Sequence, residues 1–327
     1  MDNLLQIKNL SVDLMTARGI VYVLDGVDLE VGRGEIHGIV GESGCGKSIT
    51  AKSIMHLLDK KRSRVGGSIC YNGTDISQHS ERDMRQLRGK EISMIFQEPM
   101  TSLSPLKTIG AQLGGAISNH NNIPKDELQK QVLSLLEHVG LLPAEKRAKQ
   151  YPFELSGGMQ QRVMIAQAIA CRPKLVIADE PTTALDVTIQ AQILSLIKDL
   201  QQEYAMSVLL VTHNFGVVSQ ICDRVSVMYA GRIIETANTK ELLTSPMHPY
   251  TKALIDCIPR GKALEKRLNA LSGSPPQLYE KAKCCPFLPR CKFADVLCEK
   301  APSLQSFGDH VVQCHHAFSA ADMRGGI

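Results

Sequence analysis

Short apolar runs separated by polar turns characterise the first third of the chain. Residues 21–24, 36–40 and 93–96 are apolar runs of strand length, and residues 71–74 form a polar turn between the last two. Runs of this length bounded by turn residues are typical of β-strands. Residues 49–58 interrupt the series with a helix-like segment. The pattern therefore predicts a β-rich N-terminal portion.

The pattern becomes helical from about residue 98 to residue 157. Val132, Leu135, Leu136 and Val139 follow one another as i, i+3, i+4 and i+7, a spacing that puts all four on one face of a helix. This segment is predicted to be a helical insertion.

Strand-length apolar runs return at residues 175–178, 208–211 and 225–229. Apolar runs that are continuous rather than alternating are typical of strands in a sheet covered on both faces. After residue 245 the chain changes again, because prolines interrupt it and five of the ten cysteines lie between Cys284 and Cys314. The predicted parts are an α/β core (1–97 and 158–245), a helical subdomain (98–157) and a C-terminal extension (246–327).

Composition limits the class of protein. The 327 residues are 43% hydrophobic and 21% charged, which suits one large or two modest globular domains. A net charge of +4 without a long Lys/Arg run gives no indication of nucleic-acid binding. The first residues show no secretory signal, and no apolar run approaches the roughly 18 residues needed to span a bilayer. We expect a soluble, cytosolic protein that reaches a membrane only through partners.

The run G-E-S-G-C-G-K-S at residues 41–48 fits the P-loop pattern G-x-x-x-x-G-K-[ST]. It follows a predicted strand and precedes a predicted helix, as a P-loop does. Glycines let successive N–H groups converge on phosphate oxygens, where the helix dipole also favours an anion. Lys47 then reaches the β- and γ-phosphates, and the Ser48 hydroxyl binds Mg²⁺. The alternative is a Gly-rich turn that binds no nucleotide.

Cys45 lies within the P-loop, among backbone N–H groups and close to Lys47, a setting that favours the thiolate. The predicted phosphate-binding residues are Gly41, Glu42, Ser43, Gly44, Cys45, Gly46, Lys47, Ser48 and Ile49.

An acidic pair follows the predicted strand at 175–178. Asp179, at the carboxyl end of the strand, is placed to hold the Mg²⁺ shell as a Walker B aspartate does. Glu180 is placed to orient or deprotonate an attacking water. The alternative is a strand that ends in two solvated acids; the P-loop upstream favours the catalytic interpretation.

Residues 155–162, L-S-G-G-M-Q-Q-R, complete a set of motifs that resembles the ATP-binding subunit of ABC transporters. The resemblance covers about residues 4–258 and implies an α/β P-loop ABC-type ATPase. It implies that Ser156, Gly157 and Gly158, at a helix N-terminus, face the γ-phosphate of ATP held by a second subunit.

The resemblance also implies roles for three further residues. Gln97 matches the glutamine that contacts Mg²⁺ or water and reports the nucleotide state to the helical subdomain. Asp186 matches the aspartate that links two subunits, and His213 matches the histidine that contacts the γ-phosphate. Two positions depart from the family pattern: Met159 replaces a common Gln, and Tyr22 is the only aromatic residue near the place of the adenine-stacking one.

Residues 96–105 and 245–251 are similar to the dipeptide/oligopeptide importers and their nickel-transporting relatives. Four cysteines of the extension have the spacing C-x5-C-x6-C-x15-C, and subunits with a similar tail carry a [4Fe–4S] cluster. Four thiolates can also ligate Zn²⁺, or they can stay free or form disulfides. The predicted cluster ligands are Cys285, Cys291, Cys298 and Cys314; Cys284 is adjacent, and His310, His315 and His316 are possible substitutes.

The resemblance implies a subunit that hydrolyses ATP to drive uptake of peptides or a related small solute. Its implied partners are a second, homologous but non-identical ATPase subunit, two transmembrane permease subunits and an extracytoplasmic solute-binding protein, without nucleic acid. It would then lie peripherally on the cytoplasmic face of the inner membrane. The alternatives are a soluble ABC-type ATPase with a non-transport target and a metal-binding regulatory protein switched by nucleotide.

Overall fold

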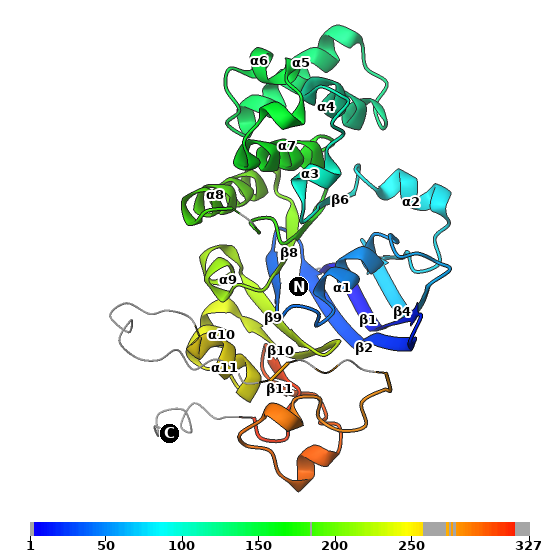
Figure 1. The fold of residues 1–327 in the computed structure, drawn as a ribbon, viewed down its shortest axis with the longest axis vertical. Coiled ribbons are helices and arrows are strands. Elements are labelled where there is room, and N and C mark those ends of the chain that lie inside the picture. The colour runs from blue at the N-terminus through cyan, green and yellow to red at the C-terminus, as the bar shows by residue number, and fades with distance from the viewer. Residues whose placement is uncertain (1–2, 184, 258–272, 275, 277–278, 318–327) are drawn as a thin grey trace. The chain divides into compact units, whose positions relative to one another are not determined.

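A computed structural model describes residues 3–183, 185–257, 273–274, 276 and 279–317 (Figure 1). The chain forms two compact units, one from Met1–Ser77 with Val211–Ile327 and one from Gln78–Leu210. The boundaries between these units differ from the predicted boundaries of the helical subdomain and the C-terminal extension. The predicted boundaries remain a prediction. Among the described residues, no helix combines the length and the apolar character needed to cross a bilayer.

The first unit begins with a four-stranded antiparallel sheet in the order β2-β1-β4-β5. Apolar side chains such as Leu5, Ile7 and Val27 are fully buried in it. The predicted strand at 21–24 is confirmed as part of a much longer one. The strands of this sheet are β1 (Asn3–Thr16), β2 (Gly19–Gly32), β4 (Ser63–Tyr71) and β5 (Thr74–Asp75).

A second group of strands in this unit has the order β11-β12-β10-β9-β3. The parallel neighbours β3 (Ile36–Val40) and β9 (Arg224–Tyr229) are buried almost throughout, as predicted for a sheet covered on both faces. The P-loop connects β3 to α1 (Lys47–Ile54), which is shorter than the predicted helix at 49–58. The remaining elements around this sheet are β10 (Arg232–Asn238), α9 (Phe215–Ile221), α10 (Thr239–Thr244) and α11 (Pro249–Asp256).

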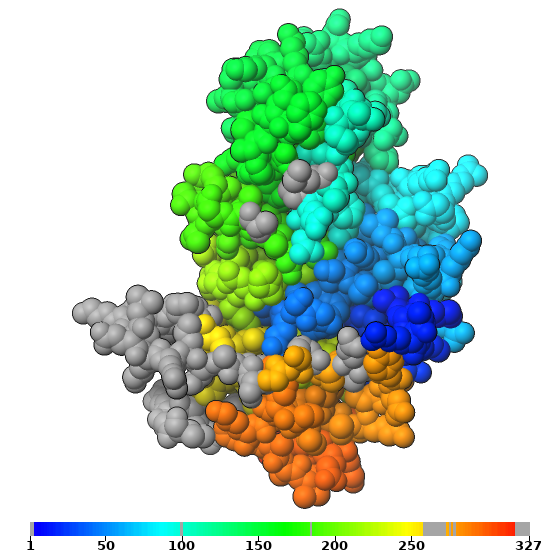
Figure 2. Space-filling model, viewed as in Figure 1, coloured from blue at the N-terminus to red at the C-terminus, as the bar shows by residue number. Residues whose placement is uncertain are grey.

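The C-terminal extension is part of the first unit and adds two strands to its sheet. In antiparallel pairing, β12 (His310–Val312) joins β10 on one side and β11 (Gln305–Phe307) on the other. Two single-turn helices, η3 (Leu288–Arg290) and η4 (Val296–Glu299), precede this hairpin. In the space-filling view, atoms of the extension (orange) lie against the N-terminal strands (blue) (Figure 2). Residues of both parts, among them Tyr22 and Tyr279, line one cavity.

A buried carboxylate anchors the extension to the sheet. Glu235 on β10 is 1% exposed and accepts hydrogen bonds from the N–H groups of Met247 (2.5 Å) and His248 (3.0 Å). Its side chain also contacts His310 Nε2 at 2.7 Å, while Nδ1 of the same ring lies 3.2 Å from Glu241. The sequence suggests His310 as a substitute ligand for the clustered cysteines, but its two ring nitrogens face these carboxylates instead.

The second unit contains the parallel pair β6 (Ile92–Ile95) and β7 (Leu175–Asp179), and the chain leaves the unit through β8 (Ser207–Thr212). Its helical part follows the predicted pattern: Val132, Leu136 and Val139 are buried, and Leu135 is partly buried. The helices are α2 (Glu81–Leu87), α3 (Pro99–Ser102), α4 (Ile109–Ser118), α5 (Lys125–His138), α6 (Ala144–Lys149), η1 (Pro152–Glu154), α7 (Gly157–Ile169) and α8 (Val187–Tyr204).

Candidate nucleotide-binding site

The P-loop has a backbone that only glycine adopts without strain at two positions. Gly44 and Gly46 have φ angles of +80° and +112°. At Gly41, a Cβ atom would lie 2.2 Å from the carbonyl oxygen of Met228, so any side chain there would displace the loop from β9. The N-cap of α1 is Gly46, which has no side chain to bond the first N–H groups of the helix. Its first N–H groups therefore face the loop, the arrangement that favours a phosphate.

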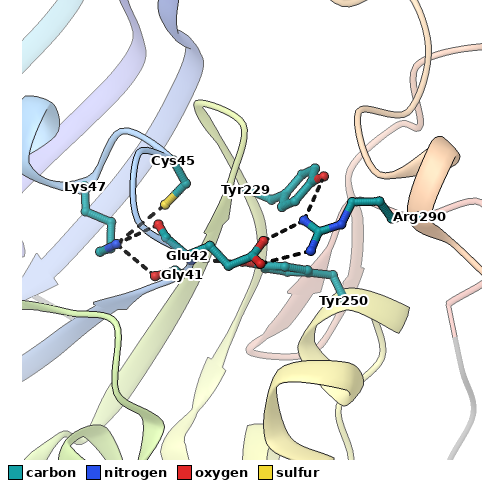
Figure 3. Close-up of polar contacts among 7 residues, drawn as sticks. All are labelled: Gly41, Glu42, Cys45, Lys47, Tyr229, Tyr250 and Arg290. Atoms are coloured by element: carbon teal, nitrogen blue, oxygen red, sulfur yellow. Dashed lines mark hydrogen bonds and ion pairs between the residues drawn. The ribbon is translucent and has the colours of Figure 1, made fainter. Parts of the chain in front are cut away.

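Lys47 holds the two ends of the loop together. Its side chain is buried, and Nζ donates hydrogen bonds to the carbonyl oxygens of Gly41 (2.8 Å) and Glu42 (2.9 Å) (Figure 3). The ammonium thus lies inside the loop, where a phosphate oxygen would meet both its charge and the backbone donors.

Cys45 differs from the expectation. The thiol is 1% exposed, and burial raises its pKa, although the charge of Lys47, 3.8 Å away, acts in the opposite direction. The prediction of a thiolate at Cys45 is therefore wrong: the loop folds the side chain inward, where desolvation outweighs the cation. Local sequence could not show this, since the burial of a side chain depends on how the whole chain packs.

A cavity of about 490 Å³ opens beside the P-loop at Gly44. Tyr22, the aromatic residue noted in the sequence, lines it with its ring 5.8 Å from the Lys281 ammonium. A second aromatic side chain, Tyr279, lines the same cavity and is 43% exposed. Sequence analysis missed Tyr279, because the extension places it beside the loop from more than 230 positions away. This cavity can take a nucleotide base next to phosphates on the loop.

The second unit contains the acidic pair. Asp179, the last residue of β7, is buried, and the following residue, Glu180, has a φ of +48°, which is strained for a residue with a side chain. Glu180 Oε2 accepts hydrogen bonds from Gln97 Nε2 (3.2 Å) and from the Thr183 hydroxyl (2.8 Å). The structure thus brings Gln97 and Glu180 together, and it adds Thr183, which sequence analysis did not name. Two donors on one oxygen give this carboxylate a defined orientation.

The N-termini of two helices carry the other predicted residues of this unit. Ser156 caps α7 by accepting from the N–H of Met159 (3.4 Å), and Asp186 caps α8 by accepting from Ile189 (2.9 Å). A Cβ on Gly158 would lie 2.8 Å from the Ile189 side chain, so the glycine permits close packing of the two helices. The predicted contacts of these residues with a second subunit remain predictions.

His213 belongs to the first unit. It follows β8 and is exposed. The predicted ATP-site residues are therefore divided between the two units, with the P-loop and His213 in one and the acidic pair, Gln97, α7 and α8 in the other.

The four predicted cluster cysteines line one small cavity of about 10 Å³, together with His315 and His316. Burial raises the pKa of Cys314 to about 12, and the neighbouring thiols of Cys285, Cys291 and Cys298 add to it. Four sulfur donors around one cavity fit a metal centre that deprotonates them on binding. A more compact group of possible ligands, with atoms within 4.8 Å of one another, consists of Asp295, Cys298 and His316.

Comparison with known proteins shows which class of protein this chain resembles. Residues 24–183 match the family "ABC transporter", and residues 234–298 match "Oligopeptide/dipeptide transporter, C-terminal region". A dimeric structure of the ATP-binding cassette MJ0796 bound to ADP and Pi is 28% identical, with a TM-score of 0.65; the match covers 72% of this chain and 98% of that one. The structure of cbiO1 from Clostridium perfringens is also 28% identical, with a TM-score of 0.63 and coverages of 74% and 91%. The fold is that of an ABC-type ATPase.

Individual relatives narrow the class. The dipeptide transport ATP-binding protein DppD of Bacillus subtilis (strain 168) is 45% identical over 96% of this chain and 95% of its own. The oligopeptide transport ATP-binding protein OppD of Escherichia coli (strain K12) is 46% identical over 94% and 90%. The chain belongs to the ABC transporter family, in the group of ATP-binding subunits that share the oligopeptide/dipeptide transporter C-terminal region.

Proposed function

We propose that the protein hydrolyses ATP as the energy-coupling subunit of an importer for peptides or a related small solute. The observation that carries the proposal is the P-loop, where a buried Lys47 ammonium and the N-terminus of α1, capped by Gly46, belong to the same loop. The names of the relatives supply the substrate class, since both are peptide transport subunits.

The chain's own residues account for the chemistry. The N–H groups of the P-loop and Lys47 bind the phosphates, and the adjoining cavity with Tyr22 and Tyr279 takes the base. Glu180, oriented by Gln97 and Thr183, accepts the proton of the attacking water. The resemblance to the family assigns Mg²⁺ binding to Ser48 in the first unit and to Asp179 and Gln97 in the second, and a bound Mg²⁺ would neutralise developing charge on the phosphates.

The proposed assembly contains partners that this chain does not include. In this assembly the chain pairs with a second, non-identical ATPase subunit. The two ATPase subunits bind two permease subunits at the cytoplasmic face of the inner membrane, and an extracytoplasmic binding protein completes the complex. The support is the match of residues 234–298 to the transporter C-terminal region and the dimeric state of a similar cassette.

We also propose that Cys285, Cys291, Cys298 and Cys314 hold a [4Fe–4S] cluster, with zinc as the alternative metal. The support is the convergence of all four thiols on one cavity. A cluster needs four thiolate donors, which this cavity supplies, whereas a single zinc ion would also suit the compact group of Asp295, Cys298 and His316.

Transport by the purified complex tests the main proposal. The complex is placed in lipid vesicles together with its binding protein. The vesicles are expected to transport labelled peptides only when MgATP is present on the side of the membrane where the ATPase subunits lie. A complex carrying Lys47→Ala is the matched control, because it loses the phosphate-binding ammonium. ATP turnover without uptake of any peptide would show that the target is not peptide import.

A further inference from the structure

Glu42 of the P-loop and Arg290 of the extension form an ion pair with two parallel arms. Arg290 Nη1 donates to Glu42 Oε2 at 2.6 Å, and Nη2 donates to Oε1 at 2.9 Å (Figure 3). The residues are 248 positions apart in the chain. A planar guanidinium that binds both oxygens of a carboxylate fixes the orientation of that carboxylate as well as its position.

The surroundings of Arg290 shield its side of the pair from water, whereas the Glu42 side chain is 24% exposed. The Arg290 side chain is 6% exposed, and its guanidinium lies 5.7 Å from the centre of the Tyr229 ring and donates to the Tyr229 hydroxyl at 3.4 Å. Phe287 packs against both Tyr229 and Tyr250, with ring centres 5.3 Å apart in each case. Because a shielded pair is screened little by salt, its loss has a larger effect than the loss of a surface pair.

Three groups of Glu42 make hydrogen bonds: its carboxylate, its backbone N–H and its carbonyl oxygen. Its carboxylate binds Arg290, its N–H donates to the Tyr250 hydroxyl at 3.0 Å, and its carbonyl oxygen accepts from Lys47 Nζ at 2.9 Å. The orientation of this peptide unit therefore determines where the Lys47 ammonium lies. Of these contacts, the Arg290 fork is the one that comes from the cysteine-rich part of the extension, residues 284–314.

Arg290 also lies within the turn that carries two of the clustered thiols. Cys291 directly follows it, and the N–H of Leu288 donates to the carbonyl oxygen of Cys285 at 3.0 Å, which closes the turn. Both Cys285 and Cys291 line the four-thiol cavity. Whatever binds these thiols restrains the backbone on either side of Arg290.

We propose that Arg290 is a positioning residue for ATP binding: it orients the P-loop through Glu42, and occupancy of the four-thiol cavity by a metal centre strengthens this hold. The first half stands on the ion pair alone, and the second half rests on the metal site proposed above. The extension is thereby a means by which the state of the cysteines sets the affinity of the subunit for ATP.

Substitution of the ion pair tests the first half in the full-length chain. Arg290→Met is expected to weaken equilibrium binding of MgATP about tenfold, and to raise KM in the assembled complex similarly, with kcat within about twofold, because uniform binding is lost. Arg290→Lys, which keeps the charge but not the fork, is expected to give an intermediate value. Combining Glu42→Gln with Arg290→Met is expected to add little, since both changes remove one interaction.

Arg232 provides the matched control. It forms a comparably buried ion pair with Asp25 (2.6 Å, side chains 14% and 16% exposed) in the same unit, and its Nη2 also donates to the carbonyl oxygen of Ala282 at 3.2 Å. Arg232→Met is expected to lower thermal stability as much as Arg290→Met does, with MgATP affinity unchanged. The proposal is overturned if folded Arg290→Met protein binds MgATP normally, if the two single effects multiply in the double variant, or if Arg232→Met weakens binding equally.

Metal loading tests the second half by an equilibrium measurement. Full-length protein reconstituted anaerobically with iron and sulfide is compared with chelator-treated protein, and the dissociation constant of MgATP is measured for each. Loading is expected to tighten binding about threefold in the wild type and to leave it unchanged in Arg290→Met. Equal tightening in both proteins, or none in either, would overturn the coupling. A complex that binds MgATP with these differences but transports nothing would contradict the importer proposal and leave the role of Arg290 intact.

Discussion

The P-loop and the cysteine-rich extension both collect donors for an anionic or metal ligand, but they reach their shapes in different ways. The P-loop gets its shape within eight consecutive residues, from two glycines with positive φ and a lysine that bonds back to the loop. The extension between residues 284 and 314 depends on distant partners, namely Glu235 for His310 and Glu42 for Arg290. Changes in the first region should therefore act on ATP chemistry, and changes in the second should act first on folding of the extension.

The largest expected effect concerns ATP hydrolysis, because this step depends on the ATP motifs and not on the extension. Glu180→Gln keeps the hydrogen-bonding shape of the side chain but removes the base, so ATP turnover is expected to fall by about 10²-fold or more, with MgATP binding retained. The variant should also accumulate the ATP-bound dimer. Steady-state hydrolysis and size-exclusion chromatography of the purified complex measure both. Hydrolysis near the wild-type rate would exclude Glu180 as the base.

The next effect concerns the extension by itself. Cys298→Ser removes a thiol that lines the cavity, and anaerobically purified variant is expected to lose the roughly four irons and four sulfides of the wild type and to unfold at a lower temperature. Its MgATP affinity should fall by no more than that of Arg290→Met, because the ATP motifs lie outside the extension.

Cys284→Ser is the matched control for this experiment, since Cys284 is adjacent but does not line the cavity. Metal and sulfide analysis with thermal unfolding distinguishes the cases. One zinc per chain without sulfide would show that the cysteines bind zinc and not an iron–sulfur cluster.

A smaller effect tests whether the two regions share the nucleotide. Tyr279→Ala removes an exposed ring of the extension from the cavity beside Gly44, and ATP affinity is expected to fall about fivefold, the range of one aromatic stacking contact. Affinity for inorganic tripolyphosphate should stay the same, because it lacks a base. Equal weakening for both ligands would show that Tyr279 supports the loop instead of the base.

The smallest effect is a pH dependence of the extension. Burial acts to lower the pKa of His310, but hydrogen bonds to Glu235 and Glu241 outweigh it and raise the pKa above the ordinary value. Protonated His310 therefore stabilises the fold fully below the unfolded pKa of about 6.5, and this stability is lost as pH rises through the folded pKa.

Thermal unfolding between pH 6 and 9 measures this effect. The melting temperature of the wild type is expected to drop by about 2–4 °C more than that of His310→Gln over this range. The MgATP affinity of both proteins at pH 7 should be alike. Parallel curves for the two proteins would assign the pH dependence to other groups.

The outcome for individual residues shows how far sequence patterns reach. The strand at Ile36–Val40 and the buried face of α5 follow from apolar spacing, which depends only on nearby residues. Cys45, Tyr279 and Thr183 were misjudged or missed, because burial, cavity lining and side-chain hydrogen bonds depend on which residues the fold brings near. His310 likewise has ligand chemistry in the sequence, but the fold pairs it with two carboxylates.

The amino-acid sequence by itself determined the P-loop, the acidic pair after β7, the helical insertion and the family, since each is written in consecutive residues whose backbone geometry and chemistry are local. Only the tertiary structure decided that four cysteines share one cavity, that Tyr279 lies beside the P-loop and that Arg290 binds Glu42. The physical reason is that these contacts join segments separated by up to 248 positions, and packing of the sheet and the extension, not a periodic pattern, brings such segments together.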